Sequence, residues 1–292
     1  MIIFFRLLSF FPLKVLHILG AGCGVLLALL SPAIRHITQA NLEQAKQPFS
    51  AWRALQENGR AVLELAWVWL RPTDTVMARV LTQSTAPLDA AIAQGKGVIF
   101  LTPHMGCFEV TAQWFAARYH SPLAQKAQMG TPITVLYRPS SKRWLAPFLA
   151  KARVRHNLHL ASADTKGVRL MLKALRKGQA IGLLPDQVPS KGEGVWVNWF
   201  EKPAYTMTLP CKLAASCNAP IVLVVAVRQP KSRGWMLHFE AFDKMLTGDP
   251  VQDTTCINHA LEKLVALAPL QYWWTYKRYK GLPSSSTPSL PQ

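Results

Sequence analysis

Short, almost uninterrupted apolar segments recur along this 292-residue chain, and stretches with helical periodicity separate most of them. A strand that is apolar at every position is buried on both faces, as in sheets that carry helices on both sides. We therefore predict an α/β fold with a single central sheet, mixed but largely parallel, covered by helices. The predicted strands are residues 97–101, 133–137, 180–185, 195–200, 221–227 and 235–242. The predicted helices are residues 48–70, 107–119, 141–153, 165–178 and 208–217.

The N-terminal segment, residues 1–33, is strongly apolar, and Arg6 and Lys14 are its only charged side chains. The apolar run 15–30 is short for a bilayer span of about 20 residues, but an extension past Lys14 would suffice. A signal peptide would have a more basic start, and a buried core helix is the plainest alternative. We favour a membrane anchor, because a basic flank follows the run and would hold the rest of the chain on the cytoplasmic side. That flank contains Arg35, His36, Lys46, Arg53 and Arg60.

The rest of the chain contains no internal repeat and no long linker. We predict an anchor over residues 1–33 and one folded domain over residues 34–282. The last residues, 283–292, are rich in Ser and Pro and are predicted to be disordered.

Charge and cysteine content narrow the partners and the compartment. Lys and Arg outnumber Asp and Glu by 33 to 15, which gives a formal net charge of +18. This excess indicates an anionic partner: nucleic acid, a phospholipid surface, or an acidic protein or phosphorylated substrate. The five cysteines include no C-x-x-C pair, so they predict neither a disulfide framework nor a zinc site, and they favour a reducing compartment.

Three polar residues each follow the end of a predicted strand. His104 comes after strand 97–101, Arg138 directly after strand 133–137, and Asp186 after strand 180–185. In sheets of this kind ligands bind beyond the carboxyl ends of the strands. We therefore expect the three side chains to meet at one edge of the sheet.

His104 and Glu109 have the chemistry of a base and its orienting group. If the turn folds back over the helix start, the Glu109 carboxylate accepts the imidazole N–H, and the other ring nitrogen can take a proton from a hydroxyl. Backbone N–H groups near Gly106 would be placed to hold an oxyanion. The plain alternative makes Glu109 a helix-start acid and His104 a turn residue. A second alternative makes Cys107 a nucleophile that His104 activates, although a Cys in an apolar stretch is usually inert.

Five segments, in order, resemble the lysophospholipid acyltransferase superfamily, and within it the branch of late lipid A (lauroyl and myristoyl) acyltransferases. "GKGVIFLTPHMGCFEV" resembles the first motif, H-x4-[DE], with His104 and Glu109 in its two positions. Two departures are Cys107–Phe108 in place of the common Asn-Trp, and Tyr276–Lys277 where His-Arg is usual. The other matching segments are "IRHITQANLEQA", "LYRPSSKRW", "GVRLMLKALRKGQAIGLLPDQVPSKGEGVWVNWFEKPAYT" and "LAPLQYWWTYKRYK".

The resemblance implies transfer of a fatty acyl chain from an acyl carrier protein thioester to a hydroxyl of a lipid A precursor. It places this reaction at the cytoplasmic face of the bacterial inner membrane, with a membrane surface, an anionic glycolipid and an acidic carrier protein as partners and without nucleic acid. It implies no metal and no cofactor. His104 is then the general base oriented by Glu109. Asp186 ends an apolar strand, where a carboxylate can support His104 or bind Arg138, or simply form the turn after Pro185. The expected substrate-binding residues are Arg138, Arg169, Gln187, Thr206 and Arg278.

Several alternatives remain open at this point. Arg138 and Arg169 can clamp anionic groups with two parallel hydrogen bonds, or they can form ordinary surface ion pairs. The acceptor can be another lipid, such as a lysophospholipid or a glycolipid. From other classes, a basic protein could dock on membranes without catalysis, or bind nucleic acid through its basic and aromatic residues 273–280.

Overall fold

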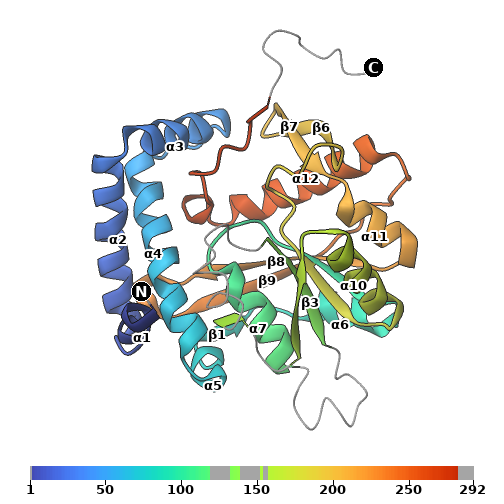
Figure 1. Ribbon diagram of the computed structural model, residues 1–292, viewed down its shortest axis with the longest axis horizontal. Helices are drawn as coiled ribbons and strands as arrows, with labels where there is room; N and C mark the ends of the chain where they lie inside the picture. The colour runs from blue at the N-terminus through green and yellow to red at the C-terminus, as the bar shows by residue number, and fades with distance from the viewer. Residues whose placement is uncertain (1, 119–131, 139–151, 154–156, 282–292) are drawn as a thin grey trace.

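The computed structural model describes residues 2–118, 132–138, 152–153 and 157–281. Within them, seven strands form one sheet in the order β1-β9-β8-β2-β5-β3-β4 (Figure 1). Strands β8, β2, β5, β3 and β4 run parallel, whereas β9 is antiparallel to β8 and parallel to β1. The predicted fold class is therefore confirmed. The strands are β1 (Val80–Thr82), β2 (Val98–Leu101), β3 (Ile133–Tyr137), β4 (Leu158–Ser162), β5 (Ala180–Leu183), β8 (Ile221–Arg228) and β9 (Trp235–Ala241).

The apolar strands supply two cores, one on each face of the sheet. In β2, Val98 and Phe100 belong to one core, while Ile99 and Leu101 belong to the other. All four side chains are at most 5% exposed, so the strand is buried on both faces, as its composition predicts. The first core includes residues of α4 (Ala51–Leu70), α6 (Ala86–Ala93) and α7 (Phe108–Arg118). The second includes residues of α10 (Thr165–Arg176), α11 (Leu209–Cys217) and α12 (Pro250–Ala266).

Most of the predicted strands and helices are present, but one predicted strand belongs to a different sheet. Residues 195–200 were predicted as a strand between those of the central sheet, but β6 (Gly194–Trp199) pairs only with β7 (Lys202–Met207) in a separate two-stranded sheet. Strands β1, β4 and β7 were not predicted, because none of them carries a continuous apolar run. The predicted helix 141–153 lies outside the described residues, except for its last two positions, which are helical.

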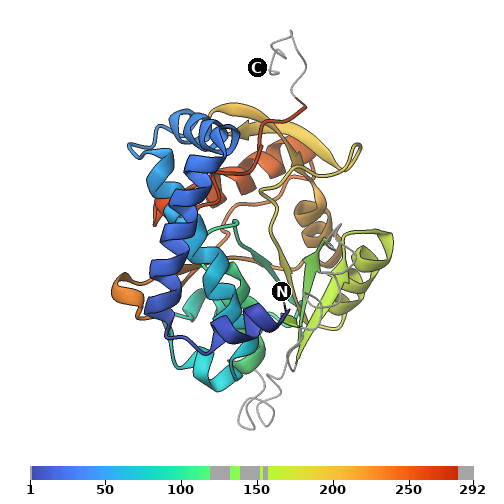
Figure 2. The same cartoon turned by 60° about the vertical axis from the view of Figure 1, so that its left-hand side comes forward.

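The N-terminal helices form a layer beside the sheet. The apolar helix α2 (Leu13–Leu30) and α4 lie side by side and antiparallel, as Figures 1 and 2 show. Among the described residues, α2 is the helix that is long and apolar enough to cross a membrane. The division at residue 33 stays a prediction, and the predicted tail 283–292 lies outside the described residues. The other elements of this layer are α1 (Ile2–Ser9), α3 (Pro32–Gln44) and α5 (Thr73–Met77).

A buried polar cluster ties this layer to the sheet. Glu64 of α4 is fully buried and accepts two hydrogen bonds from Arg228 of β8, at 2.9 and 2.8 Å. His17 of α2 approaches the same carboxylate at 2.9 Å, and its other ring nitrogen lies 2.9 Å from the Ser232 hydroxyl. Burial by itself raises the pKa of Glu64, but the Arg228 charge and the hydrogen bonds from both partners lower it to about 2. The carboxylate therefore stays charged and joins three elements.

Candidate active site

The loop after β2 presents His104 at the carboxyl edge of the sheet. Gly106 has φ +57°, and a Cβ atom there would lie 2.0 Å from the Ala226 carbonyl oxygen, so only glycine fits. The segment after η2 (Pro269–Gln271) fixes the loop from the other side, because the Trp273 N–H donates to the His104 carbonyl at 3.0 Å. Close backbone contacts on two sides thus hold the histidine in place.

Asp186 is the partner of the His104 ring. One carboxylate oxygen lies 2.7 Å from Nδ1 of His104, and the other accepts the His104 backbone N–H at 2.9 Å. Asp186 is 1% exposed. Burial raises its pKa, but the charge and hydrogen bonds of His104 outweigh burial and hold this pKa below its usual value. An ionised carboxylate only accepts hydrogen bonds, so Nδ1 of His104 carries a proton; in the neutral imidazole this leaves Nε2 with a free electron pair.

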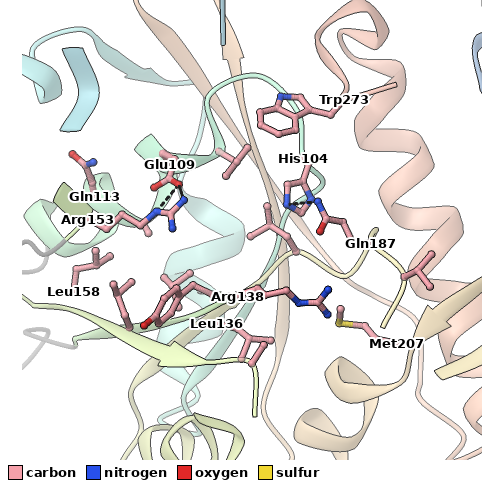
Figure 3. A pocket seen from close by; sticks show the side chains of 18 residues that line it. His104, Glu109, Gln113, Leu136, Arg138, Arg153, Leu158, Gln187, Met207 and Trp273 are labelled. Atoms are coloured by element: carbon pink, nitrogen blue, oxygen red, sulfur yellow. Dashed lines mark hydrogen bonds and ion pairs between the residues drawn. The ribbon is translucent and has the colours of Figure 1, made fainter. Parts of the chain in front are cut away.

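Gln187 occupies the position next to that electron pair. Its side-chain nitrogen lies 3.1 Å from Nε2 of His104, so the amide N–H donates to the ring (Figure 3). A hydroxyl that gives its proton to Nε2 has to displace this amide. Gln187, predicted to bind substrate, therefore lies at the ring nitrogen of His104 that is not bonded to Asp186.

Glu109 does not take the predicted place beside the imidazole. It lies in the first turn of α7, and its carboxylate pairs with the Arg153 guanidinium at 2.6 and 2.8 Å (Figure 3). The predicted Glu109–His104 hydrogen bond is thus replaced by the Asp186–His104 bond. The reason is geometric: α7 starts at Phe108 and carries Glu109 to another wall of the cavity. Arg153 was not predicted, and no spacing signal in the sequence connects it to Glu109.

A cavity of about 310 Å³ joins these groups. His104, Glu109, Arg138, Arg153 and Gln187 all line it, so the predicted meeting of His104 and Arg138 at one sheet edge is observed. Figure 3 shows the Arg138 side chain directed towards Met207, on the side where Gln187 lies. Aromatic and aliphatic side chains complete the wall, among them Phe108, Ala112, Val135, Leu158, Leu160 and Trp273. The cavity therefore offers a base and cations in an otherwise largely apolar enclosure.

Two further expectations for this loop are not supported. The Gly106 N–H donates to the Gln271 carbonyl at 3.1 Å, and the Cys107 N–H donates to the Ala226 carbonyl at 3.0 Å. Both groups are thus engaged in the fold and are not directed at an oxyanion. Cys107 is 2% exposed, and burial raises the pKa of its thiol well above the usual value. A protonated, buried thiol is a poor nucleophile.

The remaining predicted substrate-binding residues lie away from the cavity. Arg169 is exposed on α10 and does not line it. Thr206 and Arg278 are 0% and 3% exposed and are joined by a hydrogen bond in one buried cluster. Neither residue lines the cavity. Arg278 donates to the Tyr205 carbonyl at 2.8 Å and to the Thr206 hydroxyl, and its charge helps to lower the pKa of Asp186, so it lies near the carboxylate that holds His104. Within the described residues, no cluster of three or more His, Cys, Asp or Glu side chains is arranged to hold a metal ion.

A carboxylate-held imidazole that borders a cavity at the edge of an α/β sheet is an arrangement suited to enzymes that activate a hydroxyl or a water. The comparison with known families makes this specific. The chain belongs to the bacterial lipid A biosynthesis acyltransferase family, whose model matches residues 1–281. It is accordingly an acyltransferase of lipid A biosynthesis, as the ordered motifs predicted.

The similarity to individual family members is distant but extends over most of the chain. The lauroyltransferase of lipid A biosynthesis from Escherichia coli K12 is 25% identical over 93% of this chain and 87% of its own length. The palmitoleoyltransferase from the same organism is 24% identical over the same shares. The myristoyltransferase from that organism is 23% identical over 76% of this chain and 65% of its own length. These relatives differ in the acyl chain they are named for, so the similarity does not define a chain length here.

Proposed function

We propose that this enzyme transfers a fatty acyl chain from an acyl carrier protein thioester to a hydroxyl of a lipid A precursor, at the cytoplasmic face of the bacterial inner membrane. The observation that carries the proposal is the His104 imidazole, held by buried Asp186 with Nε2 directed into the cavity. Family membership supports acyl transfer to a lipid A-type acceptor. The net charge of +18 suits both a phosphorylated glycolipid and an acidic carrier protein.

The chemical step follows from the ring geometry. Nε2 of His104 removes the proton of the acceptor hydroxyl, and the oxygen attacks the thioester carbonyl. The C–O bond forms, the C–S bond breaks, and the imidazolium returns its proton to the departing sulfur. Asp186 stabilises the imidazolium and fixes its orientation through the 2.7 Å contact with Nδ1. The thioester is already an activated acyl donor, so the step as proposed requires no metal and no cofactor.

The cations of the cavity wall have a separate role in this proposal. Arg138 has no ion-pair partner among the described residues and lines the cavity next to Gln187, so its guanidinium is available to a phosphate of the acceptor. Arg153 is already paired with Glu109, and we propose that this pair positions the wall of the cavity on the α7 side. Substrate contact by Arg169 stays a prediction, and its exposed position on α10 does not favour it.

A second candidate is the same transfer to another lipid, such as a lysophospholipid or a different glycolipid. The largely apolar lining of the cavity is compatible with any acyl donor, so this candidate differs only in the acceptor. A docking protein without catalytic activity does not account for the match of residues 1–281 to an acyltransferase family.

The test uses the purified full-length enzyme in phospholipid vesicles with a labelled acyl carrier protein thioester. A lipid A precursor and a lysophospholipid are offered in parallel, and the labelled products are separated and identified by their masses in mass spectrometry. We expect label in the lipid A precursor, and none with His104→Ala. Transfer only to the lysophospholipid would move the enzyme to the second candidate, and equal transfer by His104→Ala would remove the proposed base.

A further inference from the structure

The N-terminal helices expose an unusual amount of apolar surface. Within the described residues, nine of the fifteen exposed large apolar side chains lie between residues 7 and 30. On α2 they recur at helical spacing around exposed Cys23, so they share one side of the helix. Monomeric soluble proteins rarely leave a contiguous apolar surface of this extent uncovered. This apolar face consists of Leu7, Phe10, Phe11, Ile18, Leu19, Leu26, Leu27, Leu29 and Leu30.

The opposite side of α2 is fixed to α4 by backbone contact. A Cβ atom at Gly24 would lie 2.1 Å from the Leu55 carbonyl oxygen, and one at Gly59 would lie 2.0 Å from the Gly20 carbonyl oxygen. Larger residues therefore cannot replace these glycines without separating the helices. His17 adds its hydrogen bond to buried Glu64. Helix α2 is thus packed against α4 through backbone contacts on this side.

This attachment determines how α2 can meet a bilayer. Its 18 residues span about 27 Å, slightly less than the roughly 30 Å of a hydrocarbon core. Because α4 runs alongside, a perpendicular α2 would carry Arg53, Glu57 and Arg60 of α4 into the hydrocarbon. Each charged side chain near the centre of the bilayer costs at least about 2.5–3.5 kcal/mol. A span across the membrane is therefore strongly disfavoured.

We propose that α1 and α2 lie flat in the headgroup region of one leaflet, with the apolar face towards the acyl chains of an anionic phospholipid bilayer. The inference rests on the proposed function only in taking the acceptor to be a membrane lipid. Charge complementarity supports the choice of lipid. Lys14 and Lys231 line a hollow of about 440 Å³ between α2, α4 and η1 (Pro230–Ser232), where Arg60 is paired with Glu57, and Arg6 is exposed on α1.

The same helices are in contact with the active-site wall. Phe5 of α1 stacks on Trp69 of α4 with 6.4 Å between ring centroids. The Arg153 guanidinium lies 5.4 Å from the Trp69 ring and pairs with Glu109 in the cavity. Two contacts therefore connect the proposed membrane-bound helices to the cavity that would receive a membrane lipid.

Depth-dependent fluorescence quenching separates a flat helix from a spanning one. The background carries Cys217→Ser and Cys256→Ser, which leaves Cys23 as the one fully exposed thiol among the described residues. Ile18→Cys, Leu26→Cys and Leu30→Cys are made singly together with Cys23→Ser. Each protein is labelled with a thiol-reactive fluorophore and bound to phosphatidylethanolamine–phosphatidylglycerol vesicles that carry quenchers either in the headgroup or in the middle of the acyl chains.

We expect all four positions to be quenched from the headgroup region to a similar extent, and weakly from the centre of the bilayer. A spanning helix gives a gradient, with Cys23 and residue 18 nearest the centre of the bilayer, residue 26 further out and residue 30 near its edge, and this result would overturn the proposal. Absence of quenching at every position would overturn it as well. No acyl donor or acceptor is present, so the outcome does not depend on whether the proposed transfer is right.

Vesicle partitioning provides a second test with a matched control. The double variant Leu26→Ser, Leu30→Ser removes two members of the apolar face, while Met245→Ser removes a still more exposed apolar side chain elsewhere. We expect roughly 10- to 100-fold weaker partitioning for the first, from the loss of two buried Leu side chains, and no change for the second. Binding of the wild type should fall when phosphatidylcholine replaces phosphatidylglycerol. Equal partitioning of the three proteins, or no dependence on lipid charge, would contradict the proposal.

Discussion

Two histidine–carboxylate pairs occur in the described part of this protein, with similar distances but different ring nitrogens and different surroundings. His104 and Asp186 are 2.7 Å apart, and His17 and Glu64 are 2.9 Å apart. Both carboxylates are buried, at side-chain exposures of 2% and 0%. Glu64 also accepts two hydrogen bonds from Arg228, whereas Asp186 accepts two from His104, one from the ring and one from the backbone.

The difference shows that the pair by itself does not make a catalytic site. Glu64 is neutralised by an arginine, and His17 is bonded at both nitrogens inside the fold, so this cluster holds helices together. His104 has the 310 Å³ cavity on its Nε2 side, and the group it meets there is the displaceable side chain of Gln187. Access of a substrate to the second ring nitrogen is what separates a base from a structural histidine.

The largest expected effect is a loss of kcat when His104 is replaced, compared with no loss when His17 is replaced. Each replacement is an amide side chain that keeps one nitrogen as a donor to the carboxylate. His104→Asn retains a donor for Asp186 but has no Nε2, so we expect a loss of about 10²- to 10⁴-fold in kcat. His17→Gln retains the nitrogen next to Glu64 and should leave kcat near that of the wild type. Initial rates of acyl transfer check both. Similar losses of kcat in the two variants would show that His104 and His17 do not differ in their role.

The second prediction concerns stability. Glu64→Gln leaves Arg228 with less compensation in a buried site, and we expect the free energy of unfolding at pH 7 to fall by about 3–5 kcal/mol. The folded-state pKa of Glu64 is about 2, below the roughly 4.3 of an unfolded Glu. Its stabilisation is therefore complete above pH ~4.3 and is lost as the pH falls towards 2.

Denaturant unfolding from pH 7 down to pH 2 measures this loss. The wild type should lose about 3 kcal/mol more than Glu64→Gln across that window, by the shift of roughly two pKa units. Parallel pH curves for the two proteins would show that the carboxylate is not held in its charged form by the fold.

A smaller effect is expected at the cation of the cavity. Arg138→Lys keeps the charge but loses the two parallel hydrogen bonds, and we expect kcat/KM for the lipid A precursor to fall about tenfold, or ~1.4 kcal/mol. Arg169→Lys, on the exposed surface of α10, is the matched control and should change kcat/KM by less than about twofold. Steady-state kinetics decide the point, and equal effects would remove Arg138 from the substrate site.

The smallest effect is predicted for Cys107→Ser. The thiol is buried and its raised pKa keeps it protonated, so it takes no part in the transfer. We expect kcat unchanged within about twofold and a stability cost on the order of 1 kcal/mol from placing a hydroxyl in the core. Loss of turnover in a folded Cys107→Ser protein would revive the thiol as nucleophile.

The sequence predicted the central sheet and the residues at its carboxyl edge, but not which carboxylate pairs with His104. Continuous apolar runs predict strands buried on two faces, and strand ends then bring His104 and Arg138 together. The choice between Glu109 and Asp186 depends on the direction of side chains 82 residues apart in the chain, which no periodicity encodes. Arg153 was missed for the same reason, and Thr206 and Arg278 were assigned to substrate although the fold buries them together.

The central claim is that Asp186, and not Glu109, holds the His104 imidazole. Nitrogen NMR of the His104 ring measures this directly in the wild type, Asp186→Asn and Glu109→Gln, with His104→Asn used to assign the signals. We predict a proton on Nδ1 and a free Nε2 in the wild type and in Glu109→Gln, and loss of that preference in Asp186→Asn. A ring that keeps the Nδ1 proton in Asp186→Asn but loses it in Glu109→Gln would contradict the account.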